Sequence, residues 1–485
     1  MEKYSLYSVA ELHDLLVKKE VTPLELAQEA IRLLKEDKNN VLEASMEDEA
    51  LEVASSLGEP QVDAPFWGIP VLVKDNYSTK NVESTASSDI LNGYRPVFDA
   101  EVIARLKKQG AVLIGKTTLD ELAMGGSGTT GHKGITYNPW DQKHERMMGG
   151  SSCGSAAAVA AGIVPFALGS DTGDSVRKPA SFGGLVGFKP TWGRISRFGL
   201  FPFAPSLDHV GYFTRSVLDA ALALEVLAGR DEKDATSSSR KVEKYSSSFS
   251  GVKGKKLAVI DNIVSSIKDK QNLNDFNSLL DKLVAEGAHI NHVKMDAKLL
   301  NAIYPTYIVI SCAEATSNNA NLDGVKFGPR FGGNTYEEVM TNARTKGFSE
   351  LIKRRFVIGS FALMKENQEV LFLRAQKARK LIVDAVNSIL VDNDSIILPA
   401  APSIAPLFHE DADKLSDTYL VADNHLALGN FAGLPSITIP LSIEKGMPLG
   451  INIMGRPFEE GTVLSIALEA ERLTGLKGLY SGRDK

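Results

Sequence analysis

The chain has 485 residues, 43% of them hydrophobic, so it can bury a large core, and its length suits roughly two to four domains or one large α/β domain. Its net charge is −6, from 54 basic and 60 acidic residues, which excludes a globally basic surface for nucleic acid. With only two cysteines, Cys153 and Cys312, a disulfide framework and a cysteine-rich metal site are excluded, and we assign no metal ligand.

The beginning of the chain gives no sign of export. Residues 1–16 are amphipathic and charged and lack the apolar core of a secretory signal. The apolar stretches are short and interrupted by Gly or Pro, so no membrane-spanning segment is predicted. We therefore expect a soluble cytoplasmic protein without a membrane partner.

The N-terminal region, residues 1–60, is predicted to be helical. Thr22 and Pro23 have the pattern of an N-cap followed by proline at the first helical position. Two or three helices are expected within 8–57, because apolar residues recur at helical spacing at Leu12, Leu15, Leu16, Leu24, Ala27, Ile31 and Leu34.

Strands and helices alternate in the rest of the chain. Residues 61–231 contain the Gly- and Ser-rich turns and the lysine described below, and residues 254–485 continue the same alternation. Between them, residues 232–253 are polar and Ser-rich and form either a domain linker or a long surface loop. Strands are predicted at 68–74, 111–115, 255–260, 288–293, 395–399 and 437–441, and helices at 100–110, 273–286 and 462–474. This alternation favours an α/β sheet covered on both faces.

A Gly- and Ser-rich turn at 149–155 precedes the alanine-rich residues 156–161. Such a turn places serine hydroxyls and backbone donors at a helix N-terminus, although plain helix capping is equally compatible with it. Residues 150–154 formally match the nucleophile elbow G-x-S-x-G, with Ser152 as its serine. That motif follows a hydrophobic strand, and residues 144–148 make a poor one. No phosphate-binding loop motif is present.

A second turn, at 169–180, follows the buried apolar run 163–168 and contains Ser175. Backbone N–H groups in such a turn can form an oxyanion hole, although an ordinary Ser/Asp turn would look the same. Lys74 ends the apolar run 71–73. Burial there would disfavour its ammonium form and make the amine a proton acceptor, whereas a surface position or a pair with Asp75 would not.

A serine nucleophile needs a base to take its proton, and the sequence contains no histidine with a clear catalytic setting. Of the eight, His209 is the nearest candidate, and it lies in no stretch of catalytic character. A lysine base acting through a second serine would replace it.

These elements together resemble the amidase signature family over essentially the whole chain. The match comprises the turn at 149–152, the segment D-T-G-x-S-[IV]-R-x-P-A at 171–180, the lysine within 68–76 and the 24-residue separation of Ser151 and Ser175. The resemblance implies a single α/β domain over 1–485, with a mixed central β-sheet covered by helices on both faces. It implies a Ser–cis-Ser–Lys triad, with Ser175 as nucleophile, Ser151 as the relay after a cis peptide bond, and Lys74 as base. The backbone N–H groups of Thr172, Gly173, Asp174 and Ser175 would then stabilise the oxyanion.

Within that family, several segments resemble the A subunits of aspartyl/glutamyl-tRNA(Asn/Gln) amidotransferases. They are 193–200 with 206–208, 314–318 with 323–325, 353–355 and 430–435. The likeness implies that Arg355 holds the α-carboxylate of glutamine and Asp423 its α-amino group, with Tyr307 lining the same pocket. It also implies partner subunits B and C and a charged tRNA held mainly by the partner. ATP and Mg would be bound by the partner subunit, with no cofactor in this chain.

Three residues depart from the family pattern. Cys153 and Asp174 stand where glycine is usual, and Tyr212 follows Gly211 where proline is common. If position 174 needs a positive φ, Asp tolerates it better than most residues. Its carboxylate would oppose an oxyanion, so we expect it to turn toward Arg177 or Lys178.

The likeness thus implies the glutaminase subunit of a tRNA-dependent amidotransferase, which hydrolyses glutamine to supply ammonia. Three alternatives to it stay open from the sequence. A stand-alone amidase would act on a small amide without partners and without a special need for Arg355 or Asp423. A non-catalytic scaffold is favoured only by Asp174. An esterase using Ser152 needs a strand before Gly150 and a nearby histidine.

Overall fold

The computed structural model describes residues 4–409, 416 and 418–482, so the remaining positions of the predicted N- and C-terminal regions lie outside the described residues. Eleven strands of the described chain form one sheet, in the order β1-β3-β2-β4-β6-β5-β10-β11-β9-β7-β8. In chain order they are β1 (Leu42–Ser45), β2 (Pro70–Lys74), β3 (Val112–Thr117), β4 (Phe166–Asp171), β5 (Val186–Lys189), β6 (His209–Thr214), β7 (Lys256–Ile260), β8 (His289–Val293), β9 (Ser395–Pro399), β10 (Ser436–Glu444) and β11 (Met447–Gly455).

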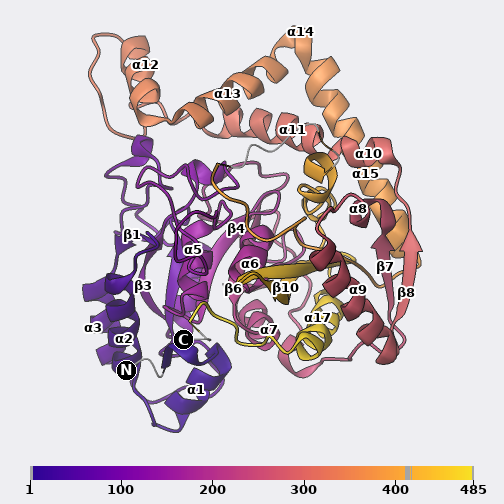
Figure 1. The fold of residues 1–485 in the computed structure, drawn as a ribbon. Helices are drawn as coiled ribbons and strands as arrows, with labels where there is room; N and C mark the ends of the chain where they lie inside the picture. The colour runs from indigo at the N-terminus through magenta and orange to yellow at the C-terminus, as the bar shows by residue number, and fades with distance from the viewer. Residues whose placement is uncertain (1–3, 410–415, 417, 483–485) are drawn as a thin grey trace.

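The helices pack around this sheet (Figure 1). The α-helices are α1 (Val9–Val17), α2 (Pro23–Glu36), α3 (Glu47–Ser56), α4 (Glu101–Lys108), α5 (Cys153–Ala160), α6 (Arg177–Gly183), α7 (Val217–Leu227), α8 (Asp261–Val264), α9 (Lys270–Ala285), α10 (Ala297–Asn301), α11 (Ile303–Asn318), α12 (Tyr336–Gly347), α13 (Glu350–Leu363), α14 (Lys365–Gln368), α15 (Arg374–Val391), α16 (Ala427–Phe431) and α17 (Glu460–Thr474). Short 3₁₀ turns occupy η1 (Tyr4–Leu6), η2 (Asp89–Leu91), η3 (Glu121–Ala123) and η4 (Tyr245–Ser247), and π-turns occupy η5 (Glu369–Leu373) and η6 (Thr418–Ala422).

The sheet is mixed, as predicted. β2 pairs in parallel with β3 and β4, whereas β4 and β6 are antiparallel. The strands that follow residues 232–253, β7 to β11, belong to the same sheet as those before. The polar connection therefore joins two parts of one sheet. It does not separate two sheets.

The predicted N-terminal helices α1, α2 and α3 are present, and Thr22 caps α2 through a capping box with Glu25. The sequence did not predict the strand β1, which lies among them and pairs antiparallel with β3. Four residues are too few for an alternating pattern to stand out, and β1 is defined by its partner strand.

Both faces of the sheet are buried, which explains the continuous apolar runs in its central strands. Along β2, Val71 and Val73 join a cluster with α1, α7 and α17, whereas Leu72 joins one with α2, α3 and α5. Successive side chains of a strand point to opposite faces, so all of β2 must be apolar until its last residue, Lys74. The α/β fold with helices on both faces is confirmed.

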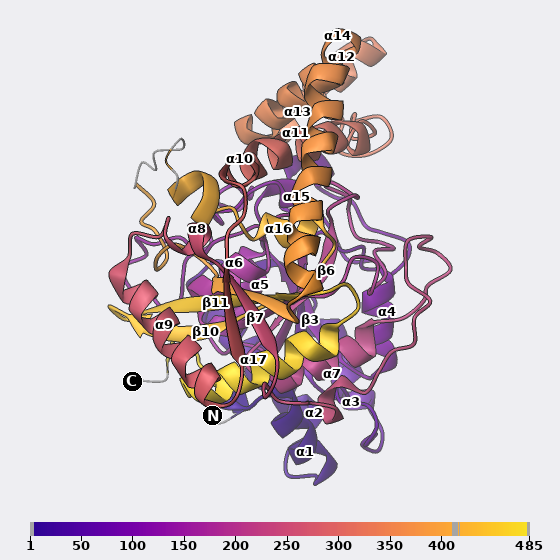
Figure 2. The same ribbon diagram turned by 90° about the vertical axis from the view of Figure 1, so that its right-hand side faces the viewer.

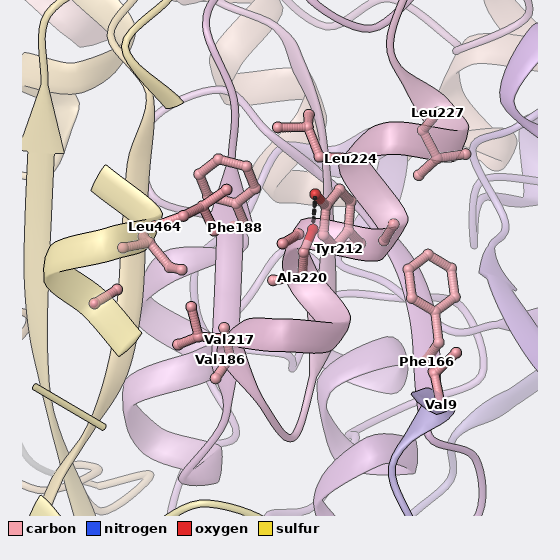
Figure 3. Packing of buried hydrophobic residues seen from close by; sticks show 14 of the residues in the cluster. Val9, Phe166, Val186, Phe188, Tyr212, Val217, Ala220, Leu224, Leu227 and Leu464 are labelled. Carbon is pink, nitrogen blue, oxygen red and sulfur yellow. Dashed lines mark hydrogen bonds between the residues drawn. The ribbon is translucent and has the colours of Figure 1, made fainter. Parts of the chain in front are cut away.

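Figure 3 shows the first of these clusters around α7. Tyr212 of β6 is fully buried there, and its hydroxyl donates to the carbonyl oxygen of Ala220 at 2.8 Å. A tyrosine thus fits at the position where the family often has proline, because its polar atom has a partner.

A third cluster lies where α11 packs against α13 and α15, in the upper part of the molecule in Figures 1 and 2. It buries Ala258 of β7, Ile396 of β9 and Met454 of β11 together with apolar residues of these helices. This helical group carries Tyr307 and Arg355. No helix within the described residues has the length and apolar character needed to cross a membrane.

Candidate active site

Lys74 is the last residue of β2, and its amine lies in a pocket of serine hydroxyls. Its Nζ lies 2.8 Å from Ser151 Oγ, 2.9 Å from Ser152 Oγ and 3.0 Å from Ser170 Oγ. Because β2 and β4 are parallel neighbours, their carboxyl ends meet at one edge of the sheet, which brings Ser170 to Lys74. Neither the Ser152 nor the Ser170 contact was predicted from the sequence.

Lys74 is fully buried and forms no ion pair with any residue that the structure describes. The alternative pair with Asp75 is wrong, because Asp75 pairs with the buried Lys116 at 2.9 Å. Burial lowers the pKa of Lys74 to about 7, and the carboxylates of Asp120, Asp171 and Asp208 offset only part of this effect. The amine is therefore partly neutral near pH 7, the state a proton acceptor requires.

Ser151 and Ser152 precede the fully buried helix α5, whose residues are small. Small side chains are needed there, since a Cβ on Gly154 would lie 2.5 Å from Thr118 Oγ1. A Cβ on Gly150 would lie 2.0 Å from a carboxylate oxygen of Asp120, so this position admits no side chain. The peptide bond between Gly150 and Ser151 is cis.

Ser151 differs from Ser152 in that its hydroxyl proton is not donated to a backbone carbonyl of the described chain. The Ser152 hydroxyl donates to the carbonyl oxygen of Ser170 at 3.1 Å. Among the described residues, Lys74 Nζ is the only hydrogen-bond partner recorded for Ser151 Oγ. Ser151 can therefore donate its proton to a neutral Lys74 without breaking another bond.

Ser175 is buried in the turn between β4 and α6, and its carbonyl oxygen accepts a bond from the Ser152 backbone N–H at 3.3 Å. The structure thus places the backbone of Ser175 next to Ser152, whose neighbour Ser151 contacts Lys74. A buried ion pair holds the turn in place, since Arg177 Nη2 lies 2.9 Å from Asp171 Oδ1 and also donates to the Gly173 carbonyl at 2.8 Å.

Asn430 completes this support from a distant part of the chain. It donates to Asp171 Oδ1 at 2.9 Å and accepts from Arg177 Nη2 at 2.6 Å. Burial alone would raise the pKa of Asp171. The opposite effect of the Arg177 guanidinium is larger and holds this pKa well below its usual range. The sequence signal for these three residues was their place in the quoted motifs, and their mutual contacts could not be predicted.

The backbone of this turn offers unpaired donors. Within the part of the chain that the structure describes, the N–H groups of Thr172, Gly173, Asp174 and Ser175 donate no recorded hydrogen bond. Four adjacent donors beside a serine hydroxyl can stabilise a negatively charged oxygen.

Asp174 turns away from these donors, as expected. Its carboxylate pairs with Lys178 Nζ at 2.7 Å. The alternative prediction, that Asp174 turns toward Arg177, is wrong, because the Arg177 guanidinium pairs with Asp171. Position 174 does not adopt a positive φ, so its backbone does not require glycine.

Tyr307 of α11 lies next to the turn, and Arg355 of α13 lies near Phe203 and Cys312. A Cβ on Gly173 would lie 3.0 Å from the Tyr307 ring, so the ring packs directly on the turn. Arg355 Cζ lies 5.8 Å from the centroid of the Phe203 ring, and its Nε and Nη1 are buried without a hydrogen-bond partner in the described chain. Two buried guanidinium N–H groups without a partner suit a carboxylate ligand.

Asp423 is the third residue predicted to bind substrate. It is linked to the Ser175 turn by Lys178, because Lys178 Nζ lies 3.3 Å from Asp423 Oδ1. Its side chain keeps 32% of its area exposed. The ion pair between Lys178 and Asp423 was not predicted, because the two residues are far apart in the sequence.

Two other candidates from the sequence, the nucleophile elbow at Ser152 and a base at His209, fail on geometry. Residues 144–149 contain no strand, and Ser152 Oγ bonds to Lys74 and Ser170, so the nucleophile elbow is wrong. His209 is buried with Nδ1 against the Leu207 carbonyl at 2.6 Å. Burial raises the pKa of the Cys153 thiol to about 12, which keeps it protonated and unreactive.

The chain matches the family described as Amidase over residues 24–464. It is 42% identical over 415 residues to the A subunit of the glutamyl-tRNA(Gln) amidotransferase of Pseudothermotoga lettingae, covering 85% of this chain and 88% of that protein. It is 39% identical to the protein of the same name from Persephonella marina over 97% of both.

Two solved structures show the same fold. The crystal structure of the glutamyl-tRNA(Gln) amidotransferase A subunit from Thermotoga maritima is similar with a TM-score of 0.78 and 37% identity, covering 97% of this chain and 95% of that one. The native peptide amidase from Stenotrophomonas maltophilia is similar with a TM-score of 0.82 and 26% identity, covering 98% of both chains.

Proposed function

Because this chain belongs to the amidase family, we propose that it is the glutaminase subunit of a tRNA-dependent amidotransferase. It hydrolyses glutamine and supplies ammonia for converting Glu-tRNA(Gln) to Gln-tRNA(Gln). The observation that carries this proposal is the contact of a buried Lys74, with its lowered pKa, with Ser151 beside the Ser175 turn. Relatives that share 39–42% of their residues with it bear the name of this subunit.

The mechanism starts with Lys74 neutral. Ser151 passes its proton to Lys74 Nζ and takes the proton of Ser175 as Ser175 Oγ attacks the side-chain carbonyl carbon of glutamine. The N–H groups of residues 172–175 bind the oxyanion of the tetrahedral intermediate. The C–N bond then breaks, and the leaving nitrogen takes a proton from Ser151, which Lys74 replaces, so that ammonia departs. Water hydrolyses the acyl-enzyme by the same proton path, releasing glutamate and restoring Ser175.

Substrate recognition follows from the charges around the turn. The unpaired N–H groups of Arg355 bind the α-carboxylate, and Tyr307 forms one wall of the pocket. The carboxylate of Asp423 binds the α-ammonium. Together these charges select a zwitterionic amino acid over a neutral amide.

We further propose that subunits B and C are the partners of this chain in the cytoplasm. ATP and Mg²⁺ bind the partner subunit, where ATP energy activates the charged tRNA. The net charge of −6 supports RNA contacts that lie mostly on the partner.

The decisive experiment measures hydrolysis of glutamine and of propionamide by the wild type and by Arg355→Met, each with and without subunits B and C and charged tRNA. Arg355→Met is expected to raise KM for glutamine by about 10- to 100-fold, because it removes charge-assisted hydrogen bonds, and to leave KM for propionamide unchanged. Arg354→Met, an exposed arginine on the same helix, is the matched control. Partners and tRNA are expected to raise the wild-type rate on glutamine.

Two outcomes would contradict the proposal. Turnover of simple amides without partners, insensitive to Arg355, would identify a stand-alone amidase. Absence of hydrolysis under every condition would identify a non-catalytic subunit.

The rate of glutamine hydrolysis is expected to rise with pH through the pKa of Lys74. Burial holds that pKa near 7, below its usual value, so the active neutral amine is lost as pH falls through 7. kcat should increase about tenfold per pH unit below the midpoint and level off above it. The measurement is kcat from pH 5.5 to 9, with circular dichroism confirming the fold at each pH. A rate that does not change with pH across this range would show that Lys74 is not the base, and a rate still rising tenfold per unit at pH 9 would show that its pKa is not lowered.

A further inference from the structure

Lys178 forms a bridge between two carboxylates next to the Ser175 turn. Its Nζ lies 2.7 Å from Asp174 Oδ2 and 3.3 Å from Asp423 Oδ1, and it donates to the Asp423 carbonyl at 2.6 Å. The lysine side chain is only 10% exposed, whereas the two carboxylates keep 21% and 32% of their area exposed. The cation is therefore covered, and the acidic side chains remain accessible.

The bridge is part of the reacting region. Asp174 directly precedes Ser175, and Lys178 lies on the first turn of α6, where its backbone N–H donates to the Asp174 carbonyl at 2.9 Å. Asp423 comes from the segment between η6 and α16, far along the chain. Burial lowers the pKa of Lys178, but the charges of Asp174 and Asp423 raise it more, so this lysine stays protonated.

The charges of this group decide what Asp423 can bind. Lys178 and Asp423 alone would sum to zero, and a substrate ammonium would meet a carboxylate that is already neutralised. Asp174 adds a second negative charge, so the three residues together carry −1. A net negative site attracts an ammonium group, and a neutral one binds it weakly.

We propose that Asp174 is a specificity-determining residue, which offsets Lys178 and leaves Asp423 able to select amides with an α-ammonium group. This inference rests on the proposed function, because it concerns how that site recognises glutamine. It also explains why an acidic residue is compatible with the position before Ser175. The carboxylate faces Lys178, and its backbone does not need a positive φ.

The test compares KM for glutamine with KM for 4-carbamoylbutanoate, which has the same amide and carboxylate and lacks the α-ammonium. In Asp174→Asn the ratio of KM for glutamine to KM for 4-carbamoylbutanoate is expected to rise about tenfold, because the site becomes neutral. In Lys178→Gln the ratio is expected to fall, because the site becomes more negative. The double variant Asp174→Asn/Lys178→Gln restores a charge of −1, and its ratio is expected to return to within about threefold of the wild type.

A purely structural role of Asp174 would not move this ratio in opposite directions in the two single variants. Equal changes in both KM values, or a double variant no better than Asp174→Asn, would overturn the inference. Ammonia transfer to Glu-tRNA(Gln) is measured in the same wild-type preparation. Its absence counts against the proposed function, whereas the KM ratios alone decide the role of Asp174.

Discussion

Replacing Ser175 with Ala is expected to lower kcat for glutamine hydrolysis by about 10⁴-fold or more, because it removes the atom that forms the acyl-enzyme. The turn itself should persist, since Arg177, Asp171 and Asn430 hold it through contacts that do not involve the Ser175 side chain. Glutamine binding, measured by isothermal titration, should therefore change little. The rate is measured by ammonia release with subunits B and C present.

The matched control is Ser181→Ala, a serine of the following helix α6. Ser181 is buried, and its hydroxyl has no hydrogen-bond partner in the described chain, so the substitution removes a hydroxyl without breaking a bond. It should retain near wild-type activity. If Ser175→Ala kept more than a few per cent of the wild-type rate, another hydroxyl near Lys74 would have to be the nucleophile.

Replacing Lys74 with Met is expected to lower kcat by about 10³- to 10⁴-fold, because Ser151 loses its proton acceptor. Lys74→Arg should not rescue the rate, since a guanidinium does not lose its proton in proteins. Stability should not fall much, because a buried ammonium without an ion pair is costly and methionine has a similar volume. The measurements are ammonia release and the urea midpoint of unfolding.

Lys116→Met is the informative contrast, because both lysines are fully buried on neighbouring strands. Lys116 pairs with Asp75 at 2.9 Å, so removing it leaves a buried carboxylate unpaired and should cost about 3–5 kcal/mol of stability. Loss of stability in Lys74→Met comparable to that in Lys116→Met would show that Lys74 has a structural role.

The amino-acid sequence determined the parts of this protein that depend on local pattern. Thr22 and Pro23 predicted the start of α2, and the apolar run ending in Lys74 predicted a strand buried on both faces. The motifs around Ser151 and Ser175 indicated the family, because the residues of each motif are consecutive. The short strand β1 was not predicted, since its existence depends on pairing with β3.

Only the tertiary structure decided which charges meet. The partners of Lys74 come from β4 and from the turn before α5, and Asp75, its neighbour in sequence, pairs with Lys116 instead. Likewise Lys178 joins Asp174 to Asp423, which lies almost 250 residues away. Ion pairs and pKa values depend on burial and on distances of a few ångströms across the fold, and a linear pattern does not contain those distances.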